Sequence, residues 1–286
     1  MKIIVLAKQV PDTRNVGKDA MKEDGTVNRA ALPAIFNPDD LCALEMALKA
    51  KDRLQNADVY VLTMGPPRAA EIVRESLYRG ADKGFLLTDR KFAGSDTLAT
   101  SYAIAQAIKQ VKPNLIFCGL QAIDGDTAQV GPQIAEKLAI PQITYAEKLI
   151  EINEQTIVVK RRLENGIETV KTSLPALITV HGSAPACRAR DAKKLMKFKH
   201  ARTLSELKEE ENDKAALFKE RPYLLIEEWN ADKVHADERS LGLTGSPTKV
   251  KKIDNVILTQ KENKTLTSSN SDIEQLMTEL LETKII

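Results

Sequence analysis

The sequence predicts an α/β fold, a doubly wound and mostly parallel sheet with a small β annex and an extended C-terminal arm ending in a helix. Three observations predict it. Apolar runs alternate with amphipathic segments over the first 140 residues, short strand-like runs separated by turns follow, and the last part is mostly polar. We therefore expect an α/β domain with its annex over residues 1–200 and an arm over 201–286.

The parallel strands are expected at four short runs that are apolar on both faces, as a covered parallel sheet requires. These runs are 3–7, 59–63, 84–87 and 115–118.

Amphipathic helices are expected between these strands. One begins at Asn37-Pro38, where Asn caps the helix and Pro takes its first position. A second follows residues 65–67, a third starts near Ser95-Asp96, and a fourth carries residues 134–138. Because ligands in such sheets bind beyond the carboxyl ends of the strands, the loops at 8–12, 64–67, 88–97 and 119–129 should meet at one rim.

Two further groups of strands are expected outside the main pattern. Residues 14–36 contain Asp24-Gly25, typical of a hairpin turn, and predict a small β excursion. The annex should contain strands at 149–152, 157–161, 168–171 and 177–180, with turns between them.

The character of the chain changes after residue 180. Residues 182–203 are strongly basic and residues 230–270 mostly polar, so we expect an extended arm that lies across a partner subunit; a disordered tail ending in a helix is the alternative. The spacing of apolar residues over 272–283 predicts that final helix.

Composition excludes several classes. The chain has 286 residues and a net charge of only +2, with few aromatic residues, which argues against nucleic-acid binding. Its three cysteines and three histidines lack metal-ligand spacing. The apolar N-terminal run is too short for a signal peptide and no run is long enough to insert in a membrane, so a cytoplasmic protein is expected.

The most informative stretch is the loop from Cys118 to Gly131, which lies between an expected strand and an expected helix. Backbone amides and a helix amino terminus there form a ready anion site. Its short polar side chains suit ribose hydroxyls and a ring edge. A solvated turn with helix caps is the alternative for any such loop.

Several motifs come in the order and spacing of the electron transfer flavoprotein β subunit, and the chain resembles that family from residue 1 to about 200. The motifs are Lys8-Gln9-Val10-Pro11-Asp12, Asn37-Pro38-Asp39, Met64-Gly65-Pro66-Pro67, Gly80-Ala81-Asp82, Gln121 to Thr127, and Val159 to Thr179. Asn165 departs from the usual glycine or acidic residue but lies in a turn that tolerates it.

The resemblance implies a heterodimer with an α subunit that carries FAD, and a nucleotide in the β subunit. That nucleotide is AMP in ordinary members and a second FAD in a subgroup resembling bifurcating flavoproteins. The implied cofactor-binding residues are Leu6, Ala7, Asn37, Asp39, Asp40, Met64, Asp96, Thr97, Gly119, Gln121, Ala122, Ile123, Asp124, Gly125, Asp126, Thr127, Ala128, Gln129 and Val130.

The small, open loop at 124–131 and the segment 92–100 resemble the FAD-binding subgroup more than the AMP-binding one. The resemblance then implies hydride transfer from NADH, with one electron passing to ferredoxin or flavodoxin and one, through the α-subunit FAD, to an acyl-CoA dehydrogenase. The flavin performs the redox chemistry, so no catalytic residue is expected.

Residues 182–193 align with the loop by which the family docks dehydrogenase partners. Arg188 and Arg190 suit a partner's acidic rim; a solvated basic face is the alternative. Nucleotide-binding stress proteins and adenylating ligases share the architecture, but this chain lacks their glycine-rich loop pattern.

Overall fold

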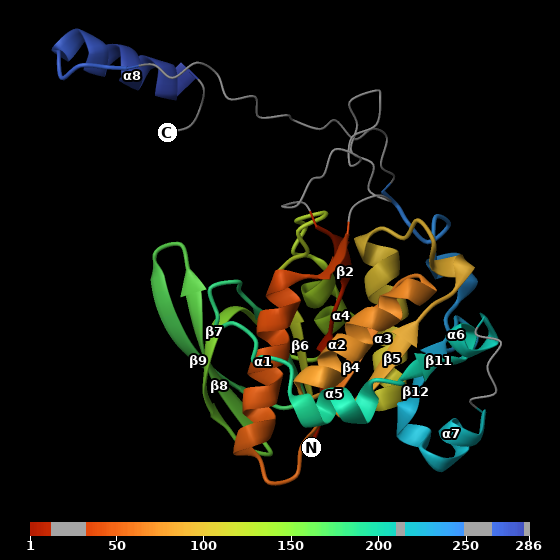
Figure 1. Cartoon of the computed structure of the whole chain (residues 1–286). Helices are drawn as coiled ribbons and strands as arrows, with labels where there is room; N and C mark the ends of the chain where they lie inside the picture. The colour runs from red at the N-terminus through yellow and green to blue at the C-terminus, as the bar shows by residue number, and fades with distance from the viewer. Residues whose placement is uncertain (13–32, 210–214, 249–264, 283–286) are drawn as a thin grey trace. The chain divides into compact units, whose positions relative to one another are not determined.

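A ten-stranded sheet organises most of the chain (Figure 1). The computed structural model describes residues 1–12, 33–209, 215–248 and 265–282. Residues 1–251 and 252–286 form two separate compact units. The sheet belongs to the first unit.

The strand order is β11-β12-β5-β4-β1-β6-β10-β7-β8-β9. The strands from β11 to β7 run parallel to their neighbours, and β7, β8 and β9 pair antiparallel. Their bounds are β1 Lys2–Leu6, β4 Asp58–Met64, β5 Lys83–Leu87, β6 Leu115–Gly119, β7 Gln142–Ile152, β8 Thr156–Leu163, β9 Gly166–Ser173, β10 Ala176–Val180, β11 Arg202–Thr203 and β12 Leu225–Trp229.

Helices cover both faces of this sheet, so the predicted doubly wound fold is confirmed. One face carries α1 (Pro38–Arg53), α2 (Ala70–Arg79) and α5 (Ala192–Phe198), and the other carries α3 (Thr97–Val111) and α4 (Val130–Leu138). The other helical elements described in the first unit are α6 Leu204–Glu209, α7 Ala215–Glu220 and the 3-10 turns η2 Pro67–Ala69, η3 Arg90–Phe92, η4 Pro222–Leu224 and η5 Glu238–Ser240.

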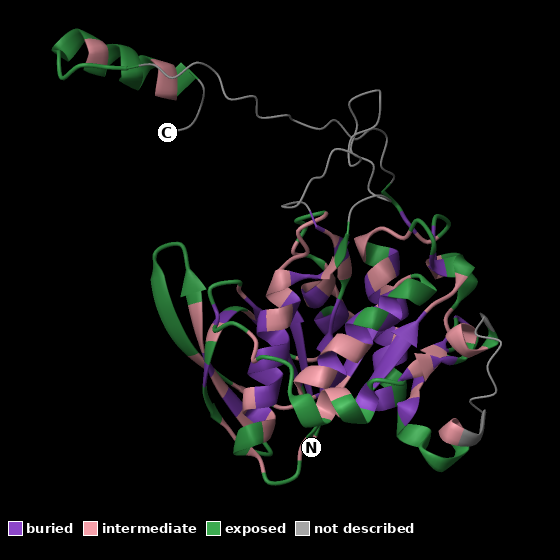
Figure 2. Ribbon diagram, viewed as in Figure 1, coloured by how far each residue is buried: buried purple, intermediate pink, exposed green. Residues whose placement is uncertain are grey.

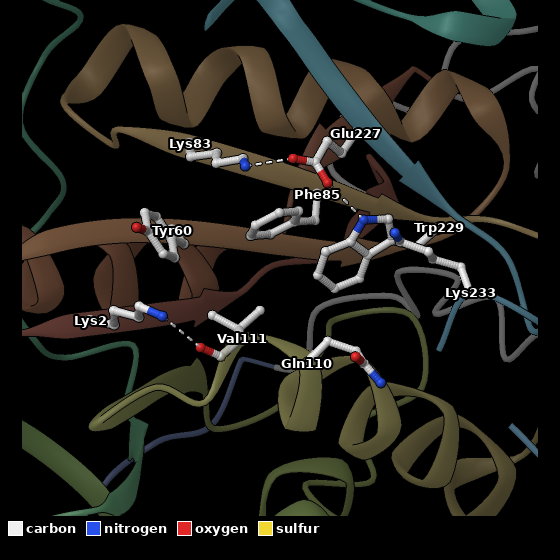
Figure 3. A pocket seen from close by; sticks show the side chains of 9 residues that line it. All are labelled: Lys2, Tyr60, Lys83, Phe85, Gln110, Val111, Glu227, Trp229 and Lys233. Carbon is white, nitrogen blue, oxygen red and sulfur yellow. Dashed lines mark hydrogen bonds and ion pairs between the residues drawn. The ribbon is translucent and has the colours of Figure 1, made fainter. Parts of the chain in front are cut away.

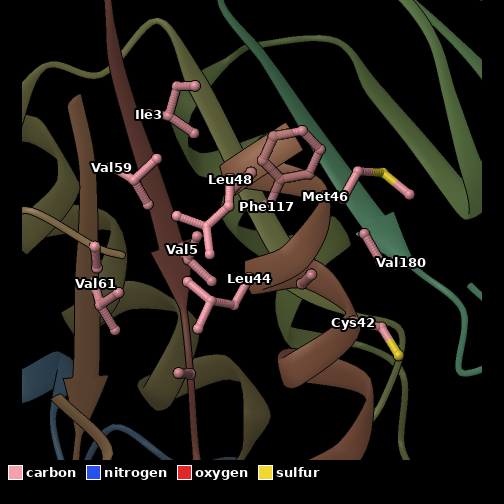
Figure 4. Close-up of a cluster of buried hydrophobic side chains, with 14 of the residues drawn as sticks. Ile3, Val5, Cys42, Leu44, Met46, Leu48, Val59, Val61, Phe117 and Val180 are labelled. Carbon is pink, nitrogen blue, oxygen red and sulfur yellow. The ribbon is translucent and has the colours of Figure 1, made fainter. Parts of the chain in front are cut away.

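The core consists of two hydrophobic clusters, one on each face of the sheet. Along β1, Ile3 and Val5 point into the cluster under α1, whereas Ile4 and Leu6 point into the cluster under α3. Figure 4 shows the first cluster and Figure 2 the buried central strands. Burial on both faces is why these strands are continuous apolar runs.

The expected β excursion appears as a separate two-stranded antiparallel sheet of β2 (Gln9–Pro11) and β3 (Ala34–Phe36). The predicted turn at Asp24-Gly25 lies outside the described residues.

The expected strands of the annex join the main sheet: β7, β8 and β9 extend it, and β10 inserts between β6 and β7 as a parallel strand. The sheet also continues past the expected boundary at residue 200, because β11 and β12 belong to it. Ile226 and Trp229 are buried there, so the chain beyond residue 200 contributes to the core.

The second unit contains α8 (Asn270–Glu282), which agrees with the helix predicted for the end of the arm. No residue of α8 is buried. Among the described residues, no helix is long and apolar enough to cross a membrane.

Candidate functional site

The carboxyl ends of β4, β1 and β6 form the rim at which the sheet changes direction. The chain proceeds from β1 to β4 and β5 on one side and then returns to place β6 on the other side of β1. Open α/β sheets bind ligands at this switch point. The loops that follow these three strands carry Ala7 and Lys8, Met64 and Gly65, and residues 119–130.

A buried carboxylate joins two of these strand ends. Asp40, in the first turn of α1, accepts hydrogen bonds from the backbone N–H of Lys8 (2.9 Å) and of Gly119 (2.8 Å). Asp40 is only 6 % exposed. Burial raises the pKa of Asp40 to about 7, although the two amides act in the opposite direction. Asp40 therefore fixes the distance between the ends of β1 and β6.

The raised pKa of Asp40 predicts a pH dependence of stability. In the folded chain Asp40 binds a proton up to about pH 7, whereas an unfolded aspartate releases it near pH 4. The stabilisation is thus present below about pH 4 and is lost as the pH rises towards 7. We expect the free energy of unfolding of the wild type, minus that of Asp40→Asn, to fall over this range in urea titrations. A difference that is constant with pH would contradict the assignment.

Asn37 joins the start of α1 to the loop after β6. Its side chain is fully buried, and its Nδ2 donates to the carbonyl of Gln121 (2.8 Å) while its Oδ1 accepts from the N–H of Ile123 (3.2 Å). The backbone N–H of Asn37 donates to the carbonyl of Lys8 (3.0 Å). One buried amide side chain therefore positions the first half of the loop.

The second half of the loop presents backbone amides. Asp126 and Ala128 have φ angles of 47° and 53°, in the left-handed region. Alternating backbone of this kind turns successive N–H groups towards one point and makes a concavity for an anion. Within the described residues, the N–H groups of 127–130, which lead into α4, have no hydrogen-bond partner. These amides fit a phosphate.

The start of α3 lies against the start of α4. Thr97 donates from Oγ1 to Oε1 of Gln129 (2.9 Å), and Gln133 donates from Nε2 to the same Thr97 oxygen (3.4 Å). Asp96 caps α3 by accepting from the N–H of Ala99 (3.0 Å) and also accepts from Thr248 (2.8 Å). Asp96 therefore caps α3 with its carboxylate.

The structure brings the expected residues together at the rim. Leu6 lies in register with Leu62 of β4 and Cys118 of β6, and Met64 ends β4. Residues 37–40 and 119–130 are joined by the bonds described above, and Thr97, which follows Asp96, reaches the rim through Gln129. Their role as cofactor ligands stays a prediction.

Sequence reasoning missed two polar residues of the rim as site residues. Lys8 forms an ion pair with Asp124 (2.7 Å), 116 positions away. Gln133 has a buried Oε1 without a hydrogen-bond donor, beside Thr97. Lys8 belongs to the motif at residues 8–12, but no local sequence pattern indicates that Gln133 lies at the rim.

The two arginines of the expected docking loop are bound within the chain. Arg188 pairs with Glu45 (2.9 Å) and Asp52 (2.7 Å), and Arg190 pairs with Glu75 (2.7 Å). Both guanidinium groups therefore attach the loop to α1 and α2 of the same chain.

A hollow of about 350 Å³ lies away from the rim (Figure 3). Lys2 and Lys83 in its lining are the first residues of β1 and β5, and Val111 is the last of α3. Glu227 in its wall bonds Lys83 (2.5 Å) and the indole N–H of Trp229 (3.0 Å). The rim is at the opposite ends of these strands and this helix, so the hollow is a separate feature.

The electron transfer flavoprotein domain matches residues 24–202, and the electron transfer flavoprotein subunit beta of Clostridium acetobutylicum is 45% identical over 252 residues, 88% of this chain and 87% of that protein. The chain belongs to the electron transfer flavoprotein β-subunit family. Two further relatives of this chain carry names that make them parts of reductases. The acryloyl-CoA reductase electron transfer subunit gamma of Anaerotignum propionicum is 53% identical over 182 residues, 63% of this chain and 67% of that protein. The caffeyl-CoA reductase-Etf complex subunit CarD of Acetobacterium woodii is 51% identical over 180 residues, 63% of this chain and 68% of that protein.

Proposed function

We propose that this chain is the β subunit of a heterodimeric electron transfer flavoprotein, that it binds FAD at the rim, and that the heterodimer bifurcates electrons from NADH. Family membership supports the pairing with an α subunit. The names of the acryloyl-CoA and caffeyl-CoA reductase relatives support a partner that acts on acyl-CoA thioesters, such as an acyl-CoA dehydrogenase.

The observation that carries nucleotide binding is the set of unpartnered amides at 127–130, at the start of α4. The amides of Leu98 and Ala99 at the start of α3 are bonded to the capping carboxylate of Asp96, so they are not available to a second phosphate. The free amides fit the phosphate that AMP and FAD share. The preference for FAD over AMP rests on the resemblance of residues 92–100 and 124–131 to the FAD-binding subgroup.

FAD held at this rim would supply the redox chemistry: hydride transfer from NADH and single-electron transfer, one electron to ferredoxin or flavodoxin and one, through the FAD of the α subunit, to the dehydrogenase. The residues of this chain bind and orient. Asn37 and Asp40 fix the strand ends, and the loop that they hold presents amides to phosphate and short polar side chains to ribose. No side chain is assigned as an acid or a base.

The decisive experiment is the content of FAD and AMP per heterodimer, measured after acid release from protein co-expressed with its α subunit. We expect two FAD and no AMP, followed by rapid reduction by NADH. One FAD with one AMP would instead identify a non-bifurcating electron carrier whose β subunit binds AMP as a structural group.

We also propose that the C-terminal arm contacts the α subunit through the apolar face of α8. Ile273, Leu276, Met277 and Leu281 are each at least 40 % exposed on this amphipathic helix. A helix of this kind binds by laying its apolar face in a groove of its partner.

The variant Leu276→Asp tests this contact, because it places a charge on the apolar face. We expect the Kd for the α subunit to rise at least about tenfold, since disrupting a buried anchor of an interface costs about 2 kcal/mol or more and about 1.4 kcal/mol is a factor of ten. Gln275→Asp adds the same charge at the neighbouring position of α8 and should change the Kd less than twofold. Equal affinities for the two variants, measured by titration calorimetry, would rule out the apolar face of α8 as the contact.

A further inference from the structure

An ion pair crosses the rim between the two strands at the switch point. Lys8 follows β1 and Asp124 lies in the loop after β6. The Nζ of Lys8 is 2.7 Å from Oδ1 and 2.8 Å from Oδ2 of Asp124, so both carboxylate oxygens are engaged. The side chain of Lys8 is 48 % exposed and that of Asp124 is 20 % exposed.

The backbone at both ends of this pair is already fixed. The N–H of Lys8 is held by Asp40 and its carbonyl by Asn37. On the other side, Asn37 holds Gln121 and Ile123, immediately before Asp124. The pair therefore spans a gap of fixed width.

The part of the loop beyond Ile123 has few other attachments. The N–H groups of Gly125 and Asp126 bond back to Ala122 within the loop itself. Outside the loop, Lys8 is the only described residue that bonds a side chain of 124–128; the next attachment is Gln129 to Thr97. The ion pair is thus the anchor in the middle of the segment that leads to the phosphate amides.

The ion pair contributes little to the stability of the fold, since a partly exposed pair gains little Coulomb energy in water and loses side-chain entropy. Its effect is on position: without it, and counting contacts with the described residues, the segment that carries the left-handed residues Asp126 and Ala128 is held at its two ends alone. Ordering that segment at the moment of binding would cost conformational entropy and weaken the complex.

We propose that Lys8 is a positioning residue of the nucleotide site and that Asp124 acts on the nucleotide through Lys8, as its ion-pair partner, rather than as a ligand of the ribose hydroxyls. This inference rests on the proposed nucleotide site and assigns a task to two of its side chains. The adenosine-phosphate part is common to AMP and FAD, so AMP is a suitable probe for either cofactor.

The test is a double-mutant cycle on the heterodimer after removal of its β-subunit nucleotide, with the Kd for AMP measured by titration calorimetry. We expect Lys8→Met and Asp124→Asn each to raise the Kd about tenfold, and the double variant to raise it no further, because each single change removes the same interaction. Lys8→Arg keeps the pair and should remain within twofold of the wild type. The thermal midpoint of the empty heterodimer should move by less than about 2 °C in every variant, which separates positioning from a defect of folding.

Lys49→Met is a matched control, since Lys49 is a similarly exposed lysine, 40 %, that pairs with Glu45 on α1 away from the rim. Its Kd should equal that of the wild type. Additive effects in the double variant would mean that Lys8 and Asp124 contact the nucleotide independently and would overturn the proposal, as would an unchanged Kd in Lys8→Met. A wild-type heterodimer that carries no β-subunit nucleotide and binds no AMP would instead reject the nucleotide site itself.

Discussion

The variant Gly119→Val is expected to lose the β-subunit nucleotide and to destabilise the fold. A Cβ at residue 119 would lie 2.5 Å from Oδ1 of Asp40, 2.7 Å from Cβ of Asp39 and 2.8 Å from the backbone carbonyl carbon of Asp39. The backbone of α1 would have to move, and the bond from the N–H of Gly119 to Asp40 would be disturbed. Overpacking of this kind costs about 1–3 kcal/mol.

The displaced element is the one that positions the site, so binding should suffer more than stability. We expect nucleotide content per heterodimer below about a tenth of the wild-type value, because α1 carries both Asn37 and Asp40 contacts to the loops and a shift of about 1 Å in a positioned site is costly. Urea unfolding and acid release of the nucleotide measure the two effects.

Gly125 supplies the matched control in the same loop. A Cβ at residue 125 meets nothing within 4 Å. Gly125→Ala should therefore keep both the stability and the nucleotide. Equal losses in Gly119→Val and Gly125→Ala would show that the loop tolerates no side chain at all, and the close approach of α1 to Gly119 would not be the cause.

The sequence predicts the strands of the central sheet well because burial on both faces demands continuous apolar runs. The same reasoning does not predict β12. Its residues include Glu227 and Glu228, which are typical of an exposed segment. In the structure Glu227 pairs with Lys83 of β5 and Glu228 accepts from Ser205, so partners distant in sequence compensate these charges. Only the topology reveals such partners, which is why the sequence pattern alone does not indicate that β12 belongs to the sheet.

The candidate site is likewise only partly predictable from the sequence. The loop after β6 is predictable because a strand, a glycine-punctuated loop and a helix follow one another directly. The bonds that hold the loop are not, since Lys8 and Asp124 are separated by 116 positions and Asn37 and Gln121 by 84. Gln133 lies one turn inside α4, where the helical pattern gives no indication that its amide reaches Thr97.

The variant Phe117→Ala is expected to cause the largest loss of stability among the changes considered. Phe117 is fully buried in β6, beneath α1, and β6 lies between β1 and β10 in the middle of the sheet (Figure 4). Truncating a buried phenylalanine removes its transfer free energy and leaves a cavity, at a cost of about 3–5 kcal/mol. At about 2–4 °C per kcal/mol in a chain of this size, the thermal midpoint should fall by about 10 °C. Ile150→Ala, at a β7 residue that is 42 % exposed, should lower the free energy of unfolding by less than about 1 kcal/mol.

The position of Phe117 also makes a prediction about binding. Gly119 follows two residues later, and its N–H bond to Asp40 fixes the end of β6 independently of the cavity beneath α1. Below its unfolding transition, Phe117→Ala should therefore retain its nucleotide, whereas Gly119→Val should lose it even where the fold remains intact. The pair of variants separates the packing of the core from the geometry of the rim: simultaneous loss of nucleotide in both, at a temperature where both are folded, would mean that the strand end is held by the core and that Asp40 has no independent part in the site.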